Sequence, residues 1–135
     1  MLYPGINSQK KTQQNLTRYR TVLYLRLSRE DGDKTESDSI ANQRTLLESY
    51  AVDHPELCIV DEFVDDGYSG SNFERPAFQR LFQELEQGTI NCILVKDLSR
   101  FGRNYIEVGR YLERIFPVMR VRLIAVTDNY DSQSA

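Results

Sequence analysis

The chain has 135 residues, of which 40% are hydrophobic and 27% charged, so its composition is that of one globular domain with a hydrophobic core. No apolar run approaches the roughly 20 residues of a membrane span and residues 1–15 lack the apolar stretch of a secretory signal, so we expect a cytoplasmic protein with no membrane partner. The net charge of -3 argues against a domain whose main task is coating nucleic acid, because non-specific binding to phosphates needs a basic surplus.

Strand and helix signals alternate along the chain after a polar start. Residues 1–20 are polar and aperiodic, so we expect a flexible leader there and one domain over residues 21–135. Apolar runs and helical patterns then predict a strand at 22–27, a helix at 39–52, a strand at 57–64, a helix at 76–87, a strand at 90–95, a helix at 104–116 and a strand at 121–127.

The predicted helices carry local start and stop signals. Three polar residues can cap the first helix: Ser37, Asp38 and Ser39. Pro76 fits the first turn of the second helix, and Gly88 stops that helix. Four apolar residues at helical spacing form the stripe of the third helix: Tyr105, Val108, Leu112 and Ile115. We expect the third helix to end before Pro117, because proline cannot continue a helix.

This alternation predicts an α/β fold of three layers. Short connections favour right-handed crossovers, a mainly parallel sheet of four or more strands, and helices on both faces. Ligands bind outside the carboxyl ends of the strands in such sheets, so the residues that follow each strand are the candidates for function. They are Ser28, Arg29 and Glu30 after the first strand; Asp65, Asp66 and Ser69 after the second; Lys96, Asp97, Ser99, Arg100 and Arg103 after the third; and Asp128 after the fourth.

Three kinds of chemistry fit these residues. Ser28 can attack a phosphodiester while Arg26, Arg75, Arg100 and Arg103 stabilise the charge on the phosphoryl oxygens, with no metal. Alternatively, Asp65, Asp66, Asp97 and Asp128 hold Mg²⁺, as in receiver-like or topoisomerase-primase-like domains. A third alternative is a non-enzymatic domain that binds a phosphorylated ligand. The density of arginines favours the first chemistry, because a cationic wall opposes a divalent cation.

Four motifs carry a family resemblance. The segments YLRLS (24–28), SIANQ (39–43), DDGYSGSNFERPAF (65–78) and VKDLSRFGRN (95–104) occur in this order. Together they resemble the catalytic domain of the serine site-specific recombinases, the resolvase and invertase superfamily, over about residues 20–131. The long loop after Ser28 and the DGYSG and RPAF segments resemble the large serine recombinases of mobile elements, such as transposon and phage integrases.

The resemblance implies a resolvase-like fold with strand order 2-1-3-4 and a reaction that cleaves and rejoins DNA. Ser28 is then the nucleophile, forming a 5′-phosphoserine link and releasing a 3′-hydroxyl without ATP, metal or another cofactor. The other implied catalytic residues are Arg26, Gln43, Asp66, Ser69, Arg75, Arg100 and Arg103. Asp65 is a register alternative for Asp66, or an ordinary turn residue, and Lys96 either supports the site or pairs with a neighbouring acid. Ser99, a further supporting candidate, stands where many relatives have Asp.

The resemblance also implies partners. Recombination sites on DNA are the substrate, and the full-length protein is expected to form a dimer and a synaptic tetramer. The family continues beyond the catalytic domain into a long helix for these contacts and into DNA-binding domains. We therefore expect this chain to be the catalytic part of a longer protein, with the C-terminal DNA-binding region absent from it.

Overall fold

The computed structural model describes residues 18–28 and 39–133. Most of the predicted leader lies outside these residues, as do Arg29, Glu30 and two of the proposed helix caps, Ser37 and Asp38. The strands are β1 (Tyr19–Leu27), β2 (Leu57–Asp66), β3 (Cys92–Val95), β4 (Arg122–Ala125) and β5 (Tyr130–Asp131). The helices are α2 (Ile40–Val52), α3 (Pro76–Gln87), α4 (Leu98–Phe101), α5 (Tyr105–Arg110), the π-helical η3 (Tyr111–Ile115) and α6 (Phe116–Met119).

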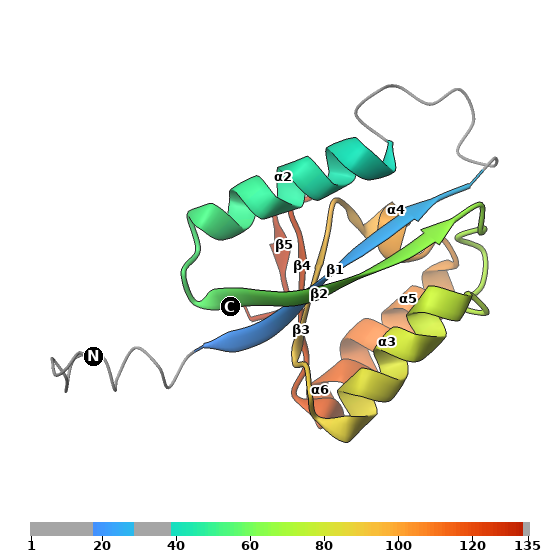
Figure 1. Cartoon of the computed structure of the whole chain (residues 1–135). Helices are drawn as coiled ribbons and strands as arrows, with labels where there is room; N and C mark the ends of the chain where they lie inside the picture. The colour runs from blue at the N-terminus through green and yellow to red at the C-terminus, as the bar shows by residue number, and fades with distance from the viewer. Residues whose placement is uncertain (1–17, 29–38, 134–135) are drawn as a thin grey trace, which may run out of the picture.

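The strands form one sheet in the order β2-β1-β3-β4-β5 (Figure 1). The pairs β1–β2, β1–β3 and β3–β4 are parallel, which confirms the predicted sheet and its 2-1-3-4 order. The short β5 adds an antiparallel edge that the sequence pattern did not predict. β1 begins at Tyr19, two residues before the expected start of the domain.

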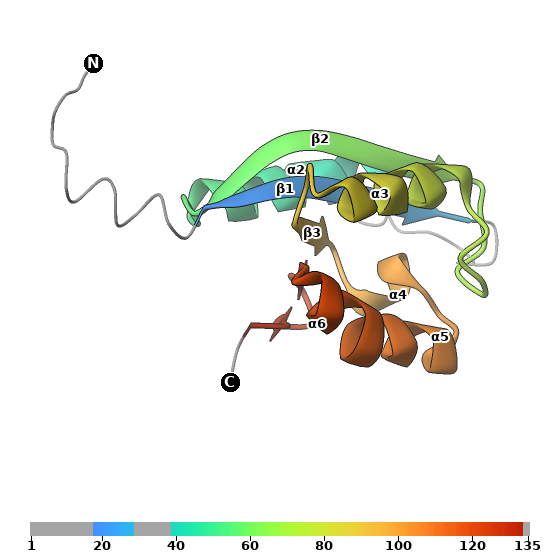
Figure 2. The same cartoon turned by 90° about the horizontal axis from the view of Figure 1, so that it is seen from below.

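Helices cover both faces of the sheet. α2 lies on one face, and α3 lies with α5, η3 and α6 on the other (Figures 1 and 2). Successive β1 side chains enter opposite cores: Leu23 and Leu25 belong to the core under α2, whereas Val22 and Tyr24 belong to the larger core on the other side. A central parallel strand that is buried on both faces has a continuous run of apolar residues, and β1 has such a run.

The caps of α2 and α3 agree with the sequence signals. Ser39 is the N-cap of α2, and its side chain accepts a hydrogen bond from the Asn42 backbone N–H. Pro76 occupies the first turn of α3. Gly88 ends that helix in the left-handed region, at φ 78°, a conformation that glycine adopts without steric penalty.

The third predicted helix differs from its expected form. It continues past Pro117 to Met119 instead of ending before the proline. The Phe116 N–H bonds to the Tyr111 carbonyl, five residues back, so the wide π turn ends there and Pro117 falls in the first turn of a new α segment, where its missing N–H is tolerated. Tyr105, expected on the buried stripe, is the first residue of α5 and is 90% exposed.

Among the helices that the structure describes, none combines the length and the apolar character that crossing a membrane requires.

Candidate active site

The candidate site lies at the carboxyl ends of β1, β2 and β3, beside α4 and the start of α2 (Figure 1). Ser28 directly follows β1 and is 5% exposed. The parallel register brings the last residues of β1 and β2 side by side, with Arg26 opposite Asp65 and Leu27 opposite Asp66. The fold therefore gathers residues from three of the four sequence motifs at one edge of the sheet, and α2 adds the fourth.

Hydrogen bonds from three other residues hold the main chain just before Ser28. The Arg26 carbonyl accepts hydrogen bonds from Gln43 Nε2 and from Arg100 Nη1, each at 3.0 Å. The next carbonyl, that of Leu27, accepts from the Gly67 N–H at 2.6 Å. Gln43 and Arg100 are both buried, so these contacts are shielded from water. Two residues predicted to be catalytic thus converge on the backbone two residues before the proposed nucleophile.

Arg26 is fully buried and connects two loops of the site. Its guanidinium donates to three carbonyl oxygens: Tyr68 at 3.0 Å, Ser99 at 2.5 Å and Arg100 at 3.0 Å. These contacts tie the loop after β2 to α4. Arg26 therefore holds the loop after β2 and α4 in place around the site, and its guanidinium does not face the surface.

Gly70 is the residue against which the Arg26 guanidinium packs. A Cβ at Gly70 would lie 2.7 Å from Arg26 Nη2 and 2.9 Å from Arg26 Cζ, closer than real Cβ contacts allow. A long side chain normally yields to such a neighbour, but Arg26 is held by three hydrogen bonds.

We therefore expect Gly70→Ala to lower the free energy of unfolding by about 1–3 kcal/mol, as overpacking of a filled interior does. Urea unfolding measures the change. Gly109→Ala is the matched control: its Cβ would meet nothing within 4 Å, and a helical Ala is favoured over Gly by about 0.5–1 kcal/mol. Equal stability of the two variants would contradict the close contact.

Arg75 is also buried, at 1% exposure. Its Nε donates to the Asn72 carbonyl and its Nη1 to the Tyr24 hydroxyl, each at 2.8 Å. The guanidinium carbon lies 4.4 Å from the centre of the Phe73 ring, a cation–π distance. Nη2 makes no hydrogen bond to any residue of the described segments. Tyr24 was not among the predicted site residues, although it lies two residues before Arg26 in the first motif.

The two adjacent acids of the second motif have different surroundings. Asp65 is 2% exposed and accepts hydrogen bonds from the Tyr24 hydroxyl and from the backbone N–H groups of Ala77 and Phe78. It thereby caps α3 from a neighbouring strand, since the N-cap residue Arg75 makes no side-chain cap bond. Asp66 is exposed at the end of β2, on the side of the sheet edge where Ser28 lies.

The third motif contains the short helix α4 and the residue that caps its start. Asp97 is the N-cap, accepting from the Arg100 N–H at 3.0 Å and from the Ser99 hydroxyl at 2.6 Å. Lys96 Nζ lies 3.6 Å from the Asp97 carboxylate. Arg103 is exposed, and its N–H donates to the Gly70 carbonyl at 2.7 Å, which links α4 to the loop of the second motif.

Three of the four acids proposed as magnesium ligands accept backbone hydrogen bonds at separate places in the fold. Asp65 and Asp97 accept backbone N–H groups, and Asp128 accepts the Leu98 N–H at 2.7 Å. Within the described segments no three acidic, histidine or cysteine side chains gather as metal ligands would. Asp65, Asp97 and Asp128 thus each hold a separate part of the backbone.

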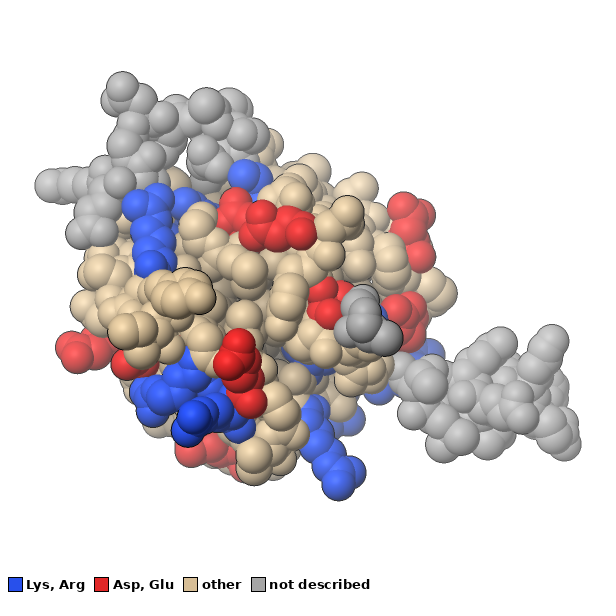
Figure 3. All heavy atoms as spheres, turned by 180° about the vertical axis from the view of Figure 1, so that it is seen from behind, with Lys and Arg blue, Asp and Glu red and all other residues tan. Residues whose placement is uncertain are grey.

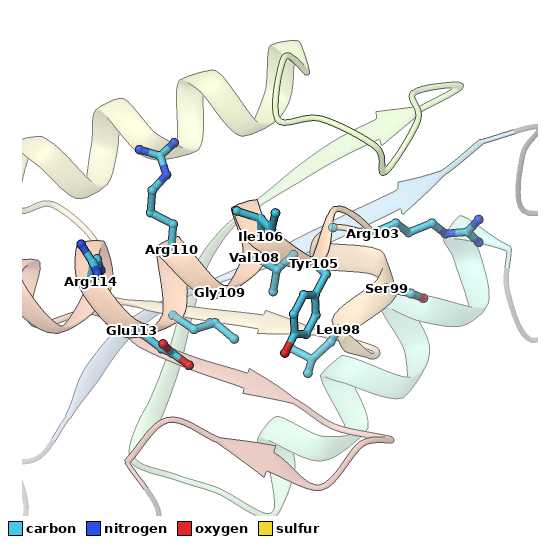
Figure 4. A pocket seen from close by; sticks show the side chains of 12 residues that line it. Leu98, Ser99, Arg103, Tyr105, Ile106, Val108, Gly109, Arg110, Glu113 and Arg114 are labelled. Atoms are coloured by element: carbon cyan, nitrogen blue, oxygen red, sulfur yellow. The ribbon is translucent and has the colours of Figure 1, made fainter.

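A groove of about 980 Å³ begins at α4 and runs along α5 and η3 (Figure 4). Its apolar lining includes Tyr105 and Ile106, which are 90% and 77% exposed. The face seen from behind carries basic and acidic side chains next to one another on a largely uncharged surface (Figure 3). This distribution agrees with the small net charge of the chain.

The chain is similar to known proteins both in sequence and in fold. The family model described as the N-terminal domain of resolvase matches residues 21–135. The crystal structure of the N-terminal catalytic domain of TP901-1 integrase is 28% identical, with a TM-score of 0.76, and the match covers 86% of this chain and 83% of that one. A resolvase family site-specific recombinase from Streptococcus pneumoniae is 30% identical, with a TM-score of 0.70 and coverage of 87% and 78%. The C-terminal catalytic domain of ISC1926 TnpA, an IS607-like serine recombinase, is 27% identical, with a TM-score of 0.64 and coverage of 79% and 67%. No curated protein sequence matches the chain.

Proposed function

This chain belongs to the family of the resolvase N-terminal domain, the catalytic domain of serine recombinases, and from that membership we propose that Ser28 is the nucleophile with which it cleaves and rejoins DNA. The observation that best supports this assignment is the convergence of Gln43 and Arg100 on the Arg26 carbonyl. Residues distant in the sequence fix the backbone beside one serine, which is the preorganisation that a nucleophile needs.

The reaction transfers a phosphoryl group from a sugar oxygen to the serine and back. Ser28 Oγ loses its proton and attacks the phosphorus of the scissile phosphodiester, and the bond from phosphorus to the 3′-oxygen breaks. The 3′-oxygen takes up a proton, which leaves a 3′-hydroxyl and a 5′-phosphoserine. Attack of a 3′-hydroxyl on this link reverses the step and rejoins the strand. One phosphoester replaces another, so the reaction needs no ATP.

The arginines supply the positive charge in this proposal. A serine hydroxyl is a weak nucleophile, so neighbouring guanidiniums must lower its proton affinity and stabilise the pentacoordinate phosphate. Arg100 contacts the backbone beside Ser28, and the exposed Arg103 comes two residues after α4. We assign both to the phosphoryl oxygens. We assign Gln43 and Arg26 to holding the chain around Ser28.

The remaining predicted residues lie at the end of β2, on the loops and in the short helix α4 around this centre. Ser69 accepts the Ser71 N–H at 2.9 Å and so shapes the loop after β2, beside the exposed Asp66. Ser99 and Lys96 both contact the α4 cap Asp97. We propose that Asp66 and Ser69 face the bound DNA, and that Ser99 and Lys96 support α4.

The partners follow from the family. Its members act on DNA and assemble into oligomers, so we propose that recombination sites on DNA are the substrate and that the full recombinase forms a dimer and a synaptic tetramer. A net charge of -3 gives this chain little long-range attraction to DNA, so we propose that further domains of the full recombinase select the DNA site.

The test is a search for the covalent intermediate. A recombinase that carries this domain is incubated with a supercoiled plasmid bearing its recombination site, denatured and digested with protease. The expected product is a peptide containing Ser28 linked to a 5′-phosphate, with free 3′-hydroxyl ends on the DNA. A link through another residue would overturn the assignment of Ser28, and 5′-phosphate ends without a protein link would overturn covalent catalysis.

We further expect cleavage to persist in excess EDTA, because arginines supply the charge stabilisation in the proposed mechanism. The measurement compares rates of covalent adduct formation with and without chelator on the same plasmid. A metal-dependent nuclease assayed in parallel shows that the chelator is effective. Loss of cleavage in EDTA and its return with Mg²⁺ would instead support the aspartate-based chemistry.

A further inference from the structure

A hydrogen-bonded chain of three buried side chains lies beneath the candidate site. Arg75 Nη1 donates to the Tyr24 hydroxyl, and that hydroxyl donates to Asp65 Oδ2, each at 2.8 Å. All three side chains are at most 2% exposed. The three residues come from β1, the end of β2 and the N-cap of α3, so the chain links three separate elements.

Asp65 is the fixed end of this chain. Two backbone N–H groups of the first turn of α3 donate to its carboxylate, at 2.9 Å from Ala77 and 3.0 Å from Phe78. With the Tyr24 hydroxyl as a third donor, the carboxylate can neither rotate nor move without breaking the cap of α3. It is therefore a rigid acceptor for the tyrosine.

Arg75 is the other end of this hydrogen-bonded chain. Bonds from Nε to Asn72 and from Nη1 to Tyr24 fix two edges of the guanidinium plane, and stacking on Phe73 fixes its tilt. Nη2 is the nitrogen that is left without a partner among the described residues. A buried donor without a partner carries a desolvation penalty, and structures retain such groups where a ligand completes them.

We propose that Tyr24 and Asp65 are positioning residues for the cleavage reaction, which hold Arg75 so that Nη2 is directed to an oxygen of the scissile phosphate. This proposal rests on the proposed function, DNA cleavage by Ser28, and adds Arg75 to the arginines that stabilise the phosphoryl group. Tyr24 and Asp65 do not touch the DNA and act only through Arg75.

Packing alone does not account for the Tyr24 hydroxyl. The Tyr24 ring meets Phe78 edge to face at a centroid distance of 5.9 Å, and a phenylalanine would make the same contact. Burying a hydroxyl is unfavourable unless it is hydrogen-bonded, so its presence reflects the two partners that it joins. Burial also raises the pKa of Tyr24 well above its usual value, so the hydroxyl keeps the proton that it donates to Asp65.

The first test is Tyr24→Phe, which removes the hydroxyl and keeps the ring. Loss of one hydrogen bond to a charged group is expected to slow covalent adduct formation about tenfold to hundredfold, with DNA affinity unchanged. Tyr111→Phe is the matched control, because its ring packs in the same core and its hydroxyl bonds to none of the described residues. It should cleave at the wild-type rate. A wild-type rate in Tyr24→Phe would overturn the proposal.

The second test asks whether Tyr24 acts through Arg75. In an Arg75→Lys background, adding Tyr24→Phe should slow single-turnover cleavage less than twofold further, because the group it positions is already gone. The same tenfold or larger loss in both backgrounds would show an independent structural effect and overturn the proposal.

A third measurement does not involve cleavage. NMR of the Arg75 Nε–H group should show slow exchange with water in the wild type and in Tyr111→Phe, and at least tenfold faster exchange in Tyr24→Phe. Unchanged exchange would overturn the link between Tyr24 and Arg75. Adduct formation that persists in Ser28→Ala would instead overturn the proposed function, and the exchange measurement would still report whether the hydroxyl holds Arg75.

Discussion

Replacing Ser28 by alanine should abolish the covalent protein–DNA intermediate and all strand exchange while the fold remains intact. The change removes the oxygen that forms the phosphoserine bond, so no alternative group at this position can complete the first step. Ser28 is a small residue at the end of β1, outside both hydrophobic cores, and its loss creates no large cavity. The melting temperature should therefore stay within a few degrees of the wild type.

The matched control for this experiment is Ser49→Ala, the same change at an exposed position of α2, which should leave adduct formation unaffected. Denaturing gel electrophoresis of labelled DNA gives the fraction of protein-linked strands for each variant. Protein-linked DNA in the Ser28→Ala sample would assign the nucleophile to another residue.

Lysine at position 100 or 103 should lower the cleavage rate by about 10²–10³, the typical loss of one preorganised donor to a developing oxyanion. Arginine presents a planar fork of donors, and Arg100 uses Nη1 to hold the Arg26 carbonyl at 3.0 Å. A single ammonium cannot keep this contact and also span two phosphoryl oxygens. Affinity for DNA should change little, because the charge is retained.

Arg110→Lys is the control for both substitutions. Arg110 is an exposed arginine of α5 whose guanidinium lies 2.9 Å from Glu107, so the lysine variant should cleave at nearly the wild-type rate. Single-turnover cleavage and a DNA-binding titration, measured on the same preparations, separate chemistry from binding. Near-wild-type cleavage by both Arg100→Lys and Arg103→Lys would show that cleavage does not need a guanidinium at either position.

The fold was predictable where local sequence and tertiary packing agree. α3 is such a case, with Pro76 in its first turn, Gly88 at its end and an apolar stripe that is buried as expected. The prediction was wrong at Pro117, because no local rule shows that a π turn will place the proline at a helical start. β5 has only two residues, and its pairing with β4 depends on a turn in which Asn129 adopts a positive φ.

The residues of the site were easier to predict than their surroundings. Sequence position placed Ser28, Arg100 and Arg103 at one sheet edge, since each comes soon after a parallel strand. Arginine is rarely buried, so no pattern in the sequence predicted Arg26 and Arg75 in the interior. Their partners are mostly backbone carbonyls, which any sequence provides, and the Tyr24 hydroxyl has no local signal.

Because three guanidiniums are buried, ionic strength should affect the capture of DNA and the cleavage of its strands differently. Dissolved ions screen charges that water reaches, and they weaken the first encounter between DNA and exposed basic groups. They do not enter a protein interior, so the field of Arg26, Arg75 and Arg100, at 0%, 1% and 4% exposure, is largely unscreened. Added salt should consequently reduce how often DNA is captured far more than it slows strand breakage after capture. A recombinase built this way can reject weakly held DNA at physiological salt and still keep its full chemical rate at a site that it retains.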